Sequence, residues 1–439
     1  MLESLLRVPD LCWHHRDLRP VASPAEHARP GTYDGLAGRF AVADRVGDQV
    51  VLVRDPLGLN KLFFAVHQDH GVVAASYLAD LRAIGVPFEA IYAVPAGTLI
   101  EIDPRRQTLT CRRLHHLSRR SPAEASDLSA ALDRIRTELD CYFGHLRRQF
   151  AQSQVAVCLS GGLDSALVAA FASEHLSDVI AYTYSYTGGG AQSADVSLAQ
   201  RTASHLGLPS RLVQAGPADV LGALHDSVRF GQDWRDFNVH AAIVNVLLAD
   251  AVTRDARAAG RTSPAIVLTG DLMNELVADY TPVRYRDHDY YRLPAISHDA
   301  LRLALTRGIQ AGDREVGVFQ SRDLTAVQPY AAVFRRLLDL PGTLAKPDLI
   351  RGVADGRLPA AFYERVKARA QIGDTQVRSG ILPLLADSGR DAQWLERLAC
   401  NVLDVQDQRA LRNFIRAGAY RSCQAFPGRR CGRSGYLSV

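Results

Sequence analysis

The stretch that decides the fold is Gln154-Val-Ala-Val-Cys-Leu-Ser-Gly-Gly-Leu-Asp-Ser165, which continues as Ala166-Leu-Val-Ala-Ala-Phe-Ala172. The apolar run before the glycines has the length of a buried strand, and the run after them has the pattern of a buried helix. Two adjacent glycines between a strand and a helix let the main chain turn sharply and approach a ligand closely. This stretch therefore predicts a strand, a phosphate-binding turn and a helix.

Strands and helices continue to alternate beyond this stretch. The patterns predict a strand over Val179–Tyr184, a helix over Val196–Leu206, a buried helix over Ala241–Val252 and a strand over Ala265–Thr269. Such alternation is typical of an α/β domain with a parallel sheet and a site at the carboxyl ends of its strands. We expect residues 295–439 to be mostly helical and to pack on this sheet.

The first part of the chain has a different pattern. Short β segments broken by turn residues run from residue 31 to about 115, at Arg39–Ala43, Gln49–Arg54, Leu62–His67, Gly71–Ser76 and Gly97–Ile102. An amphipathic helix then follows from Ser121, its predicted cap, to Phe150. We therefore predict a β-rich domain over residues 1–120 and an α/β domain over residues 121–439.

Composition excludes several classes of protein. The net charge of +4, from 51 basic and 47 acidic residues, is too small and too scattered to predict a nucleic-acid or membrane surface. Seven cysteines form no CxxC pair and no zinc-type grouping with histidine, which favours free thiols in a reducing compartment. The first residues lack the pattern of a signal peptide, so we expect a cytoplasmic protein.

The glycine turn has the chemistry of an anion site. Main-chain N–H groups and a helix N-terminus would converge there, and the hydroxyls of Ser160 and Ser165 could donate as well. Asp164 would repel a bare phosphate, so we predict that it binds Mg²⁺ between itself and the phosphate. No Walker lysine follows the turn, which excludes a Walker A loop.

Leu159-Ser-Gly-Gly-Leu-Asp-Ser165 resembles the PP-loop of the ATP-pyrophosphatase superfamily, in particular its asparagine synthetase branch. The resemblance implies a PP-loop synthetase domain, similar to adenine nucleotide α-hydrolases, with ATP and Mg²⁺ as cofactors. It assigns ATP binding to Leu159, Ser160, Gly161, Gly162, Asp164 and Ser165. Thr183-Tyr-Ser-Tyr186 is similar to the family's adenine-contacting strand and adds Tyr184, and Ala194–Gly207 is similar to the helix that follows it.

Thr269-Gly-Asp-Leu-Met-Asn-Glu-Leu-Val-Ala-Asp-Tyr280 resembles the family's second signature, small-Gly-x-Gly-x-Asp-Glu-x-x-x-Gly-Tyr. The resemblance assigns Thr269 and Gly270 to the cofactor site. Asn274 stands where the family has a metal-binding aspartate, and an amide is the poorer ligand for a hard cation. We therefore predict Asp271 as a metal ligand beside Asp164, and Asp271 and Glu275 as catalytic. Two alternatives stay open: a weaker metal site, and Asp271 as a simple helix cap.

Arg365-Val-Lys-Ala-Arg-Ala-Gln-Ile-Gly-Asp374 is similar to the family's turn that carries a catalytic lysine. A fixed cation there would stabilise charge on the α-phosphate and the acyl centre, so we predict Lys367 as catalytic. The alternative is a surface lysine on a helix. On the acceptor side, Arg235, Asp236, Asn238 and His240 are candidates to contact the substrate, and a solvated loop with a helix cap is the equal alternative.

Arg54-Asp-Pro-Leu-Gly58 resembles a segment of the family's glutaminase domain, which implies that residues 1–120 form a truncated, β-rich domain like an Ntn hydrolase. Glutamine-dependent members use an N-terminal cysteine whose own amino group is the base. This chain begins Met1-Leu-Glu3, and Cys12 has no free α-amine unless a leader is removed. We therefore expect the glutaminase to be inactive.

Together these features predict an ATP- and Mg²⁺-dependent ligase that adenylates a carboxylate, releases pyrophosphate and then AMP, and forms an amide without glutamine. The resemblance favours secondary metabolism, such as antibiotic biosynthesis. Alternatives are ring closure of the β-lactam or lasso-peptide type, a non-catalytic nucleotide-binding partner, and a tRNA-modifying PP-loop enzyme. The expected partners are a small carboxylate and an amine, on one molecule or two, without nucleic acid or membrane, and a homodimer stays open.

Overall fold

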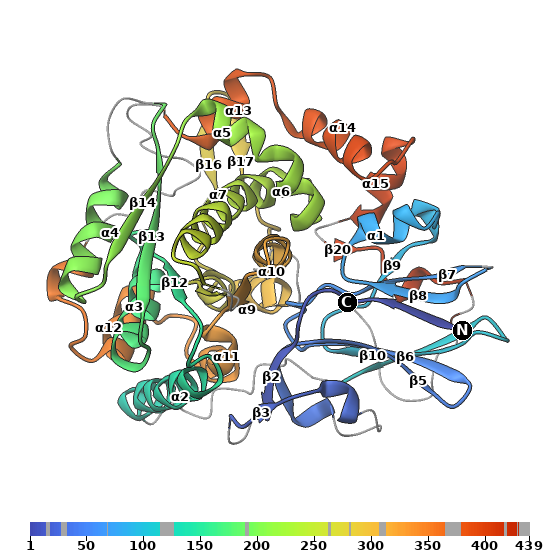
Figure 1. Ribbon diagram of the computed structural model, residues 1–439, viewed down its shortest axis with the longest axis horizontal. Helices are drawn as coiled ribbons and strands as arrows, with labels where there is room; N and C mark the ends of the chain where they lie inside the picture. The colour runs from blue at the N-terminus through green and yellow to red at the C-terminus, as the bar shows by residue number, and fades with distance from the viewer. Residues whose placement is uncertain are drawn as a thin grey trace. The chain divides into compact units, whose positions relative to one another are not determined.

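The computed structural model describes residues 1–14, 18–27, 33–67, 69–114, 127–188, 193–261, 265–280, 282–306, 313–364, 379–416, 419–427 and 429 (Figure 1). The chain divides into two compact units. Unit 1 contains residues 1–118, 303–317 and 396–439, and unit 2 contains residues 119–302 and 318–395.

Unit 1 is rich in strands. Its elements are β1 (Leu2–Leu5), β2 (Leu11–His14), β3 (Pro20–Val21), β4 (Leu36–Arg39), β5 (Ala41–Val46), β6 (Gln49–Arg54), β7 (Phe63–His67), β8 (Gly71–Ala75), α1 (Leu78–Ala83), β9 (Tyr92–Ala93), β10 (Thr98–Asp103), β11 (Thr108–Arg113), α15 (Gln408–Phe414), β19 (Ile415–Arg416) and β20 (Ala419–Tyr420).

Unit 2 alternates strands and helices. Its elements are α2 (Leu128–Gln149), β12 (Val155–Cys158), α3 (Leu163–His175), β13 (Val179–Tyr186), α4 (Ala194–His205), β14 (Ser210–Ala215), α5 (Pro217–Gly222), α6 (Leu224–Gly231), α7 (Asp236–Ala258), β15 (Ile266–Leu268), α8 (Met273–Val277), β16 (Val283–Tyr285), β17 (His288–Tyr290), β18 (Thr325–Val327), α11 (Tyr330–Asp339), α12 (Lys346–Ala354) and α13 (Ile381–Asp387). Helices α9 (His298–Ala304), α10 (Asp313–Gln320) and α14 (Ala392–Val402) contain residues of both units.

The predicted parallel sheet is confirmed in unit 2. Its strand order is β14-β13-β12-β15-β18, and every neighbouring pair is parallel. The chain builds β13 and β14 on one side of β12 and then crosses to build β15 and β18 on the other. Strand order therefore reverses beside β12, and ligands of open α/β sheets bind at such a point, outside the carboxyl ends of the strands.

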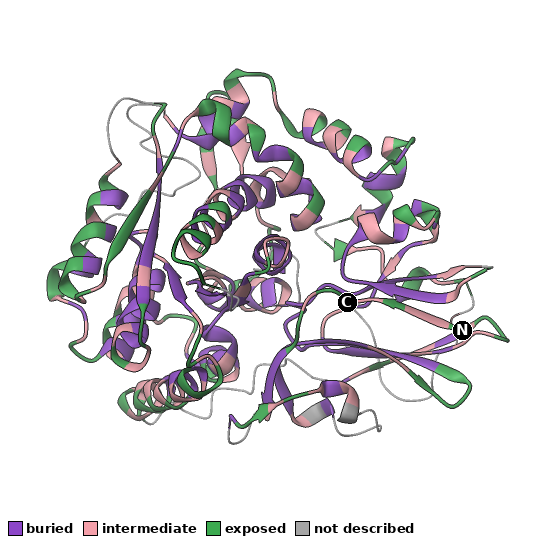
Figure 2. Cartoon of the chain, viewed as in Figure 1, coloured by how far each residue is buried: buried purple, intermediate pink, exposed green. Residues whose placement is uncertain are grey.

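Helices cover both faces of this sheet. Helices α3 and α4 lie on one side of the strands and α7 lies on the other (Figure 1). Residues Asp164–Ala172 of α3 are all buried, because the helix lies between the sheet and neighbouring helices α2 and α12 (Figure 2). Burial on all sides explains why the sequence of α3 is apolar all round, without the one-sided stripe of a surface helix.

Unit 1 is built from mainly antiparallel sheets, with β1 and β8 paired in parallel, and these sheets enclose two apolar cores. Successive residues of a strand point to opposite faces of the sheet. In β6, Val50 and Leu52 accordingly join one core with Phe64 of β7, while Val51 and Val53 belong to a second core. Strand β6 is therefore buried on both faces. This part of the chain is β-rich as predicted.

The structure differs from the sequence expectations at two places. Helix α2 begins at Leu128, and its N-cap is Asp127, which accepts a hydrogen bond from the N–H of Ala130. Ser121, the predicted cap, lies outside the described residues. Residues 295–439 do not all pack on the parallel sheet, because residues 303–317 and 396–439 group with unit 1. Apolar burial explains the second difference: the ring of Phe414 packs on those of Phe63 and Phe88.

Within the described part of the chain, no helix is both long enough and apolar enough to cross a bilayer.

Candidate active site

The glycine turn lies where strand order reverses. Leu159, the residue after β12, donates from its N–H to the oxygen of Tyr182 at 2.9 Å, and its own oxygen accepts from the Thr183 hydroxyl at 3.0 Å. These bonds extend the pairing of β12 with β13 up to the turn. Helix α3 then begins at Leu163 with Gly162 as its N-cap. Because the first N–H groups of a helix have no partner inside it, the turn presents donors to a ligand.

The two predicted serines hold the turn in shape. The Ser165 hydroxyl accepts from the N–H of Ser160 at 3.1 Å and donates to the oxygen of Gly162 at 3.1 Å. The hydroxyl oxygens of Ser160 and Ser165 lie 3.0 Å apart. The serines therefore bond mainly to the loop itself in this structure, and the loop is preorganised before any ligand binds.

Two glycines are required by close packing around this turn. Gly161 has φ +74°, and a Cβ there would overlap the main-chain oxygen of Asp195 in α4. A Cβ on Gly270 would lie 2.7 Å from the nitrogen of Ser165. The predicted second signature thus lies directly against the first turn of α3, and only glycine allows the two main chains this separation.

A hollow of ≈ 650 Å³, its open mouth included, lies beside the turn. It is lined by Cys158, Leu159, Ser160, Tyr182–Tyr186, Ser193, Asp195, Val196, Val244, Leu248 and Ser379. Tyr184, predicted at the cofactor site, is 8% exposed, and its hydroxyl accepts or donates no hydrogen bond among the described residues. Burial raises the pKa of this phenol, so it stays neutral and able to donate.

Asp164 meets a lysine that the sequence analysis did not single out. The Nζ atom of Lys346, the first residue of α12, lies 3.1 Å from Asp164 Oδ2, 2.7 Å from Asn274 Oδ1 and 2.6 Å from Asp279 Oδ2. Burial opposes the charge of Lys346, but Asp164 and Asp279 outweigh it and raise the pKa of the ammonium. The only sequence signal for Lys346 is that lysine is rare in this chain, which has just three.

The second signature follows β15. Asp271 is partly buried and lies two residues before α8, and the N-cap of α8, Leu272, has no side-chain cap bond. The capping alternative for Asp271 stays open. Leu272 has φ +80°, at the second glycine of the family pattern. Glu275 is 2% exposed and accepts a hydrogen bond of 2.7 Å from the hydroxyl of Tyr280. Catalytic roles for Asp271 and Glu275 stay predictions.

The acceptor-side candidates bond mostly to one another or to near neighbours. Arg235 pairs with Asp233, and the amide of Asn238 donates to the same carboxylate at 2.7 Å. His240 lies 2.8 Å from the Tyr291 hydroxyl, and burial lowers the pKa of its imidazole to about 3. Burial also raises the pKa of Asp236. Asp233, not among the predicted residues, is the centre of this group.

Lys367, predicted as catalytic, lies outside the described residues, as do all of residues 365–378.

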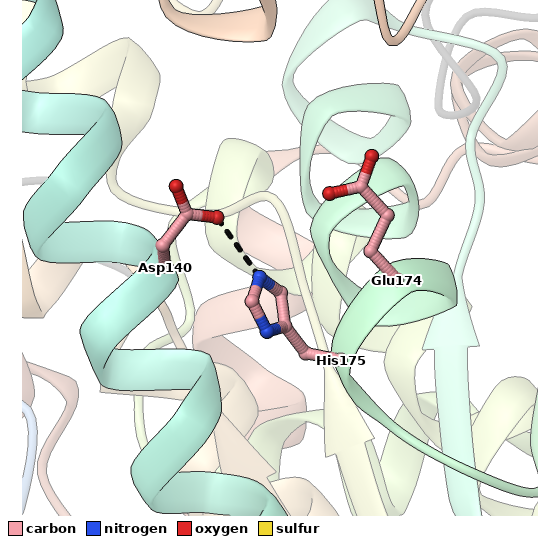
Figure 3. Close-up of side chains that lie close together, drawn as sticks. All are labelled: Asp140, Glu174 and His175. Atoms are coloured by element: carbon pink, nitrogen blue, oxygen red, sulfur yellow. Dashed lines mark hydrogen bonds and ion pairs between the residues drawn. The ribbon is translucent and has the colours of Figure 1, made fainter.

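Among the described residues, the one group of three histidine, cysteine or acidic side chains near enough to share a metal ion is Asp140, Glu174 and His175 (Figure 3). Figure 3 shows His175 pointing to Asp140, and their atoms lie 2.8 Å apart. Arg357 donates to Asp140 at 3.1 Å and to Glu174 at 2.8 Å, and it stacks over the Phe171 ring at 4.5 Å. The guanidinium bonds to both carboxylates, so this group is an ion-pair network.

In unit 1 the Arg54–Gly58 segment forms a self-contained turn. The Asp55 carboxylate accepts from the N–H groups of Leu57 and Leu59, and Arg54 donates to the oxygens of Gly58, Asn60 and Val94. Cys12 is buried in β2, and burial raises the pKa of its thiol to about 12. At that pKa it is a poor nucleophile at neutral pH.

The sheet order, the glycine turn at its reversal point and the adjoining hollow define a nucleotide-binding α/β domain of the PP-loop kind. Comparison with known families agrees: residues 146–340 match the family model described as asparagine synthase.

Curated relatives agree at low identity. The chain is 19% identical over 275 residues to a probable glutamine-hydrolyzing asparagine synthetase of Acanthamoeba polyphaga mimivirus, covering 58% of this chain and 48% of that protein. It is 24% identical over 258 residues to the glutamine-hydrolyzing asparagine synthetases of Bos taurus and Homo sapiens, covering 55% of this chain and 45% of each. Residues 146–340 are thus similar to the asparagine synthase family, and the chain spans about half the length of the curated relatives it matches.

Proposed function

We propose that this chain is an ATP- and Mg²⁺-dependent ligase that adenylates a carboxylate and transfers the acyl group to an amine. The observation that carries the proposal is the Ser160–Ser165 turn, which lies at the reversal point of a parallel sheet and lines a hollow together with strand β13. The family match over residues 146–340 supports the same chemistry.

The proposed reaction has two steps. A carboxylate oxygen of the substrate attacks the α-phosphorus of ATP, and the bond to the bridging oxygen breaks, so that pyrophosphate leaves. The amine nitrogen then attacks the acyl carbon, AMP leaves with the electron pair of the acyl–oxygen bond, and the amine loses a proton. The first-turn N–H groups of α3 would hold the pyrophosphate, because donors aimed at developing negative charge stabilise a transition state.

The residues at the turn fit a divalent cation. Asp164 is 6% exposed, and its Oδ1 accepts no hydrogen bond from the described residues. A buried carboxylate oxygen without a partner is costly unless a ligand completes it. Bound there, Mg²⁺ would neutralise phosphate charge as pyrophosphate leaves.

We further propose that the nitrogen does not come from glutamine and that unit 1 is a degenerate glutaminase-like domain of the Ntn type. Buried Cys12, with its raised pKa, supports this, because a glutaminase nucleophile must be reachable and readily ionised. A role in secondary metabolism, with a small carboxylate and amine as substrates, belongs to the same proposal.

ATP–[³²P]pyrophosphate exchange tests the adenylation step. With a panel of carboxylic acids, we expect exchange that requires one class of acid and that Asp164→Ala abolishes. Asp287→Ala, at an exposed turn between β16 and β17, is the matched control and should exchange at the wild-type rate. Absence of exchange with every acid in the panel would contradict the ligase assignment.

Mass spectrometry of the products separates the two forms of amide synthesis. A product that contains both the acid and an added amine indicates an intermolecular ligase. Loss of one water from the acid without added amine indicates ring closure.

A further inference from the structure

Two departures from the family signature lie together in space. Asn274 stands at the position of the family's aspartate, and Asp279 stands at the glycine before Tyr280. Helix α8 is short and ends at Ala278 in a left-handed conformation, and the N–H of Asp279 then donates to the oxygen of Asn274 at 3.0 Å. Compared with the family signature, the chain thus has an amide in place of one carboxylate, at Asn274, and an additional carboxylate at Asp279.

Three oxygens from this region and from the first turn of α3 surround one cation. Asp164 Oδ2, Asn274 Oδ1 and Asp279 Oδ2 lie 3.1, 2.7 and 2.6 Å from Lys346 Nζ. Three hydrogen bonds use all the donors of an ammonium group. The protein therefore builds a pocket for positive charge from oxygen ligands only, the kind of ligand that hard divalent cations prefer.

The Lys346 ammonium does not satisfy every oxygen and every charge of this pocket. Asp164 is 6% exposed, and its second oxygen, Oδ1, is buried and accepts no hydrogen bond within the described part of the chain. Two carboxylates against one ammonium also leave a net charge of −1. A divalent cation in place of the ammonium would balance both carboxylates and could bind the remaining oxygen.

We propose that Asp279 replaces the missing aspartate as the second carboxylate of a divalent-cation site with Asp164 and Asn274, and that Lys346 holds this site in the metal-free chain. The inference rests on the proposed function. When the cation binds, the Lys346 ammonium is released beside the pyrophosphate turn, where it can pair with a phosphate. Asp279 thus supplies the carboxylate that Asn274 lacks, and both residues belong to the same signature.

The test measures binding of Mn²⁺ by electron paramagnetic resonance, alone and with an ATP analogue that carries a methylene between the α and β phosphorus atoms. We expect Asp279→Asn to weaken Mn²⁺ binding by roughly tenfold or more, the usual scale for losing one partner at a metal site. The double variant Asn274→Asp, Asp279→Gly, which rebuilds the family pattern, should recover the wild-type affinity. Asp287→Asn is the matched control and should leave it unchanged.

Equal Mn²⁺ affinity in wild type and Asp279→Asn, both folded by circular dichroism, overturns the role of Asp279. So does a wild-type chain that binds no Mn²⁺ in either condition, or a double variant that fails to recover. If Mn²⁺ binds and depends on Asp279 while the analogue does not bind, the metal site stands and the proposed ligase function fails.

Discussion

The ammonium of Lys346 lies 3.1 Å from the carboxylate of Asp164, and this pair joins the start of helix α12 to the first turn of α3 across 182 residues of sequence. Both side chains are largely buried, at 17% and 9% exposure, whereas Asp279 on the other side of the ammonium is 52% exposed. The Lys346 ammonium thus has one carboxylate partner inside the protein, Asp164, and one at its surface, Asp279.

Lys346→Met should lower the free energy of unfolding by about 1–3 kcal/mol at pH 7, because a buried carboxylate loses its partner. The folded-state pKa of Lys346 is raised, so its contribution is present below the pKa of the unfolded chain and is lost as pH rises through the folded value. Urea denaturation of both proteins should therefore show a difference that is constant from pH 7 to 9 and shrinks above about pH 10.4.

Arg284→Met is the control for this prediction, because Arg284 forms an exposed ion pair with Asp289. Surface pairs contribute about 0–1 kcal/mol. An effect of Lys346→Met no larger than that of Arg284→Met would show that the buried pair does not stabilise unit 2.

His240 makes the protein sensitive to acid. Its folded-state pKa is about 3 because of burial, while the unfolded chain takes up the proton near pH 6.5. Stability from this group is thus complete above pH 6.5 and falls as pH decreases, by ~1.4 kcal/mol per pH unit, or ~2 kcal/mol at pH 5. Urea denaturation of wild type and His240→Gln at pH 7 and pH 5 measures this effect. The loss of unfolding free energy between the two pH values should be ~2 kcal/mol smaller in His240→Gln.

The exposed His288 is the control for acid sensitivity, and His288→Gln should leave the loss between pH 7 and pH 5 intact. If His240→Gln and wild type lose the same stability, His240 is already protonated in the folded protein.

Gly161→Ala should abolish nucleotide binding. A Cβ at this position would overlap the main chain of Asp195, so the turn must move. Gly260 is a matched control, because it has φ +66° and no atom within 4 Å of an added Cβ. Both variants carry the left-handed strain of alanine, about 1–2 kcal/mol, but only Gly161→Ala carries the overlap. Calorimetric titration with ATP should therefore show binding by Gly260→Ala alone.

Tyr184→Phe should separate stability from nucleotide binding. The Tyr184 hydroxyl is buried without a hydrogen bond among the described residues, so its removal should leave the free energy of unfolding unchanged or raise it by about 1 kcal/mol. Because Tyr184 lines the hollow and its hydroxyl is left able to bond to a ligand there, the variant should bind ATP several-fold more weakly. Thermal melts and ATP titration measure the two effects. Unchanged ATP affinity would remove Tyr184 from the cofactor site.

Much of the fold was predictable because it depends on short-range patterns. The strand, turn and helix at Gln154–Ala172 and the parallel sheet follow from apolar runs and glycines that act over a few residues. The start of helix α2 was less predictable, because serine and aspartate both cap helices and the sequence offers both Ser121 and Asp127. Assignment of residues 303–317 and 396–439 to unit 1 depends on distant apolar contacts that no local pattern reports.

The sequence by itself determined the glycine turn, the parallel sheet that carries it, and the presence of Asn274 where the family has an aspartate. Each of these features depends on residues that are adjacent in the chain. Only the tertiary structure decided that Lys346 and Asp279 meet Asp164 and Asn274. Side chains on separate elements come together only when those elements pack, and a charge buried by packing must then find a partner. Which residue pairs with a buried charge is therefore decided by the tertiary structure.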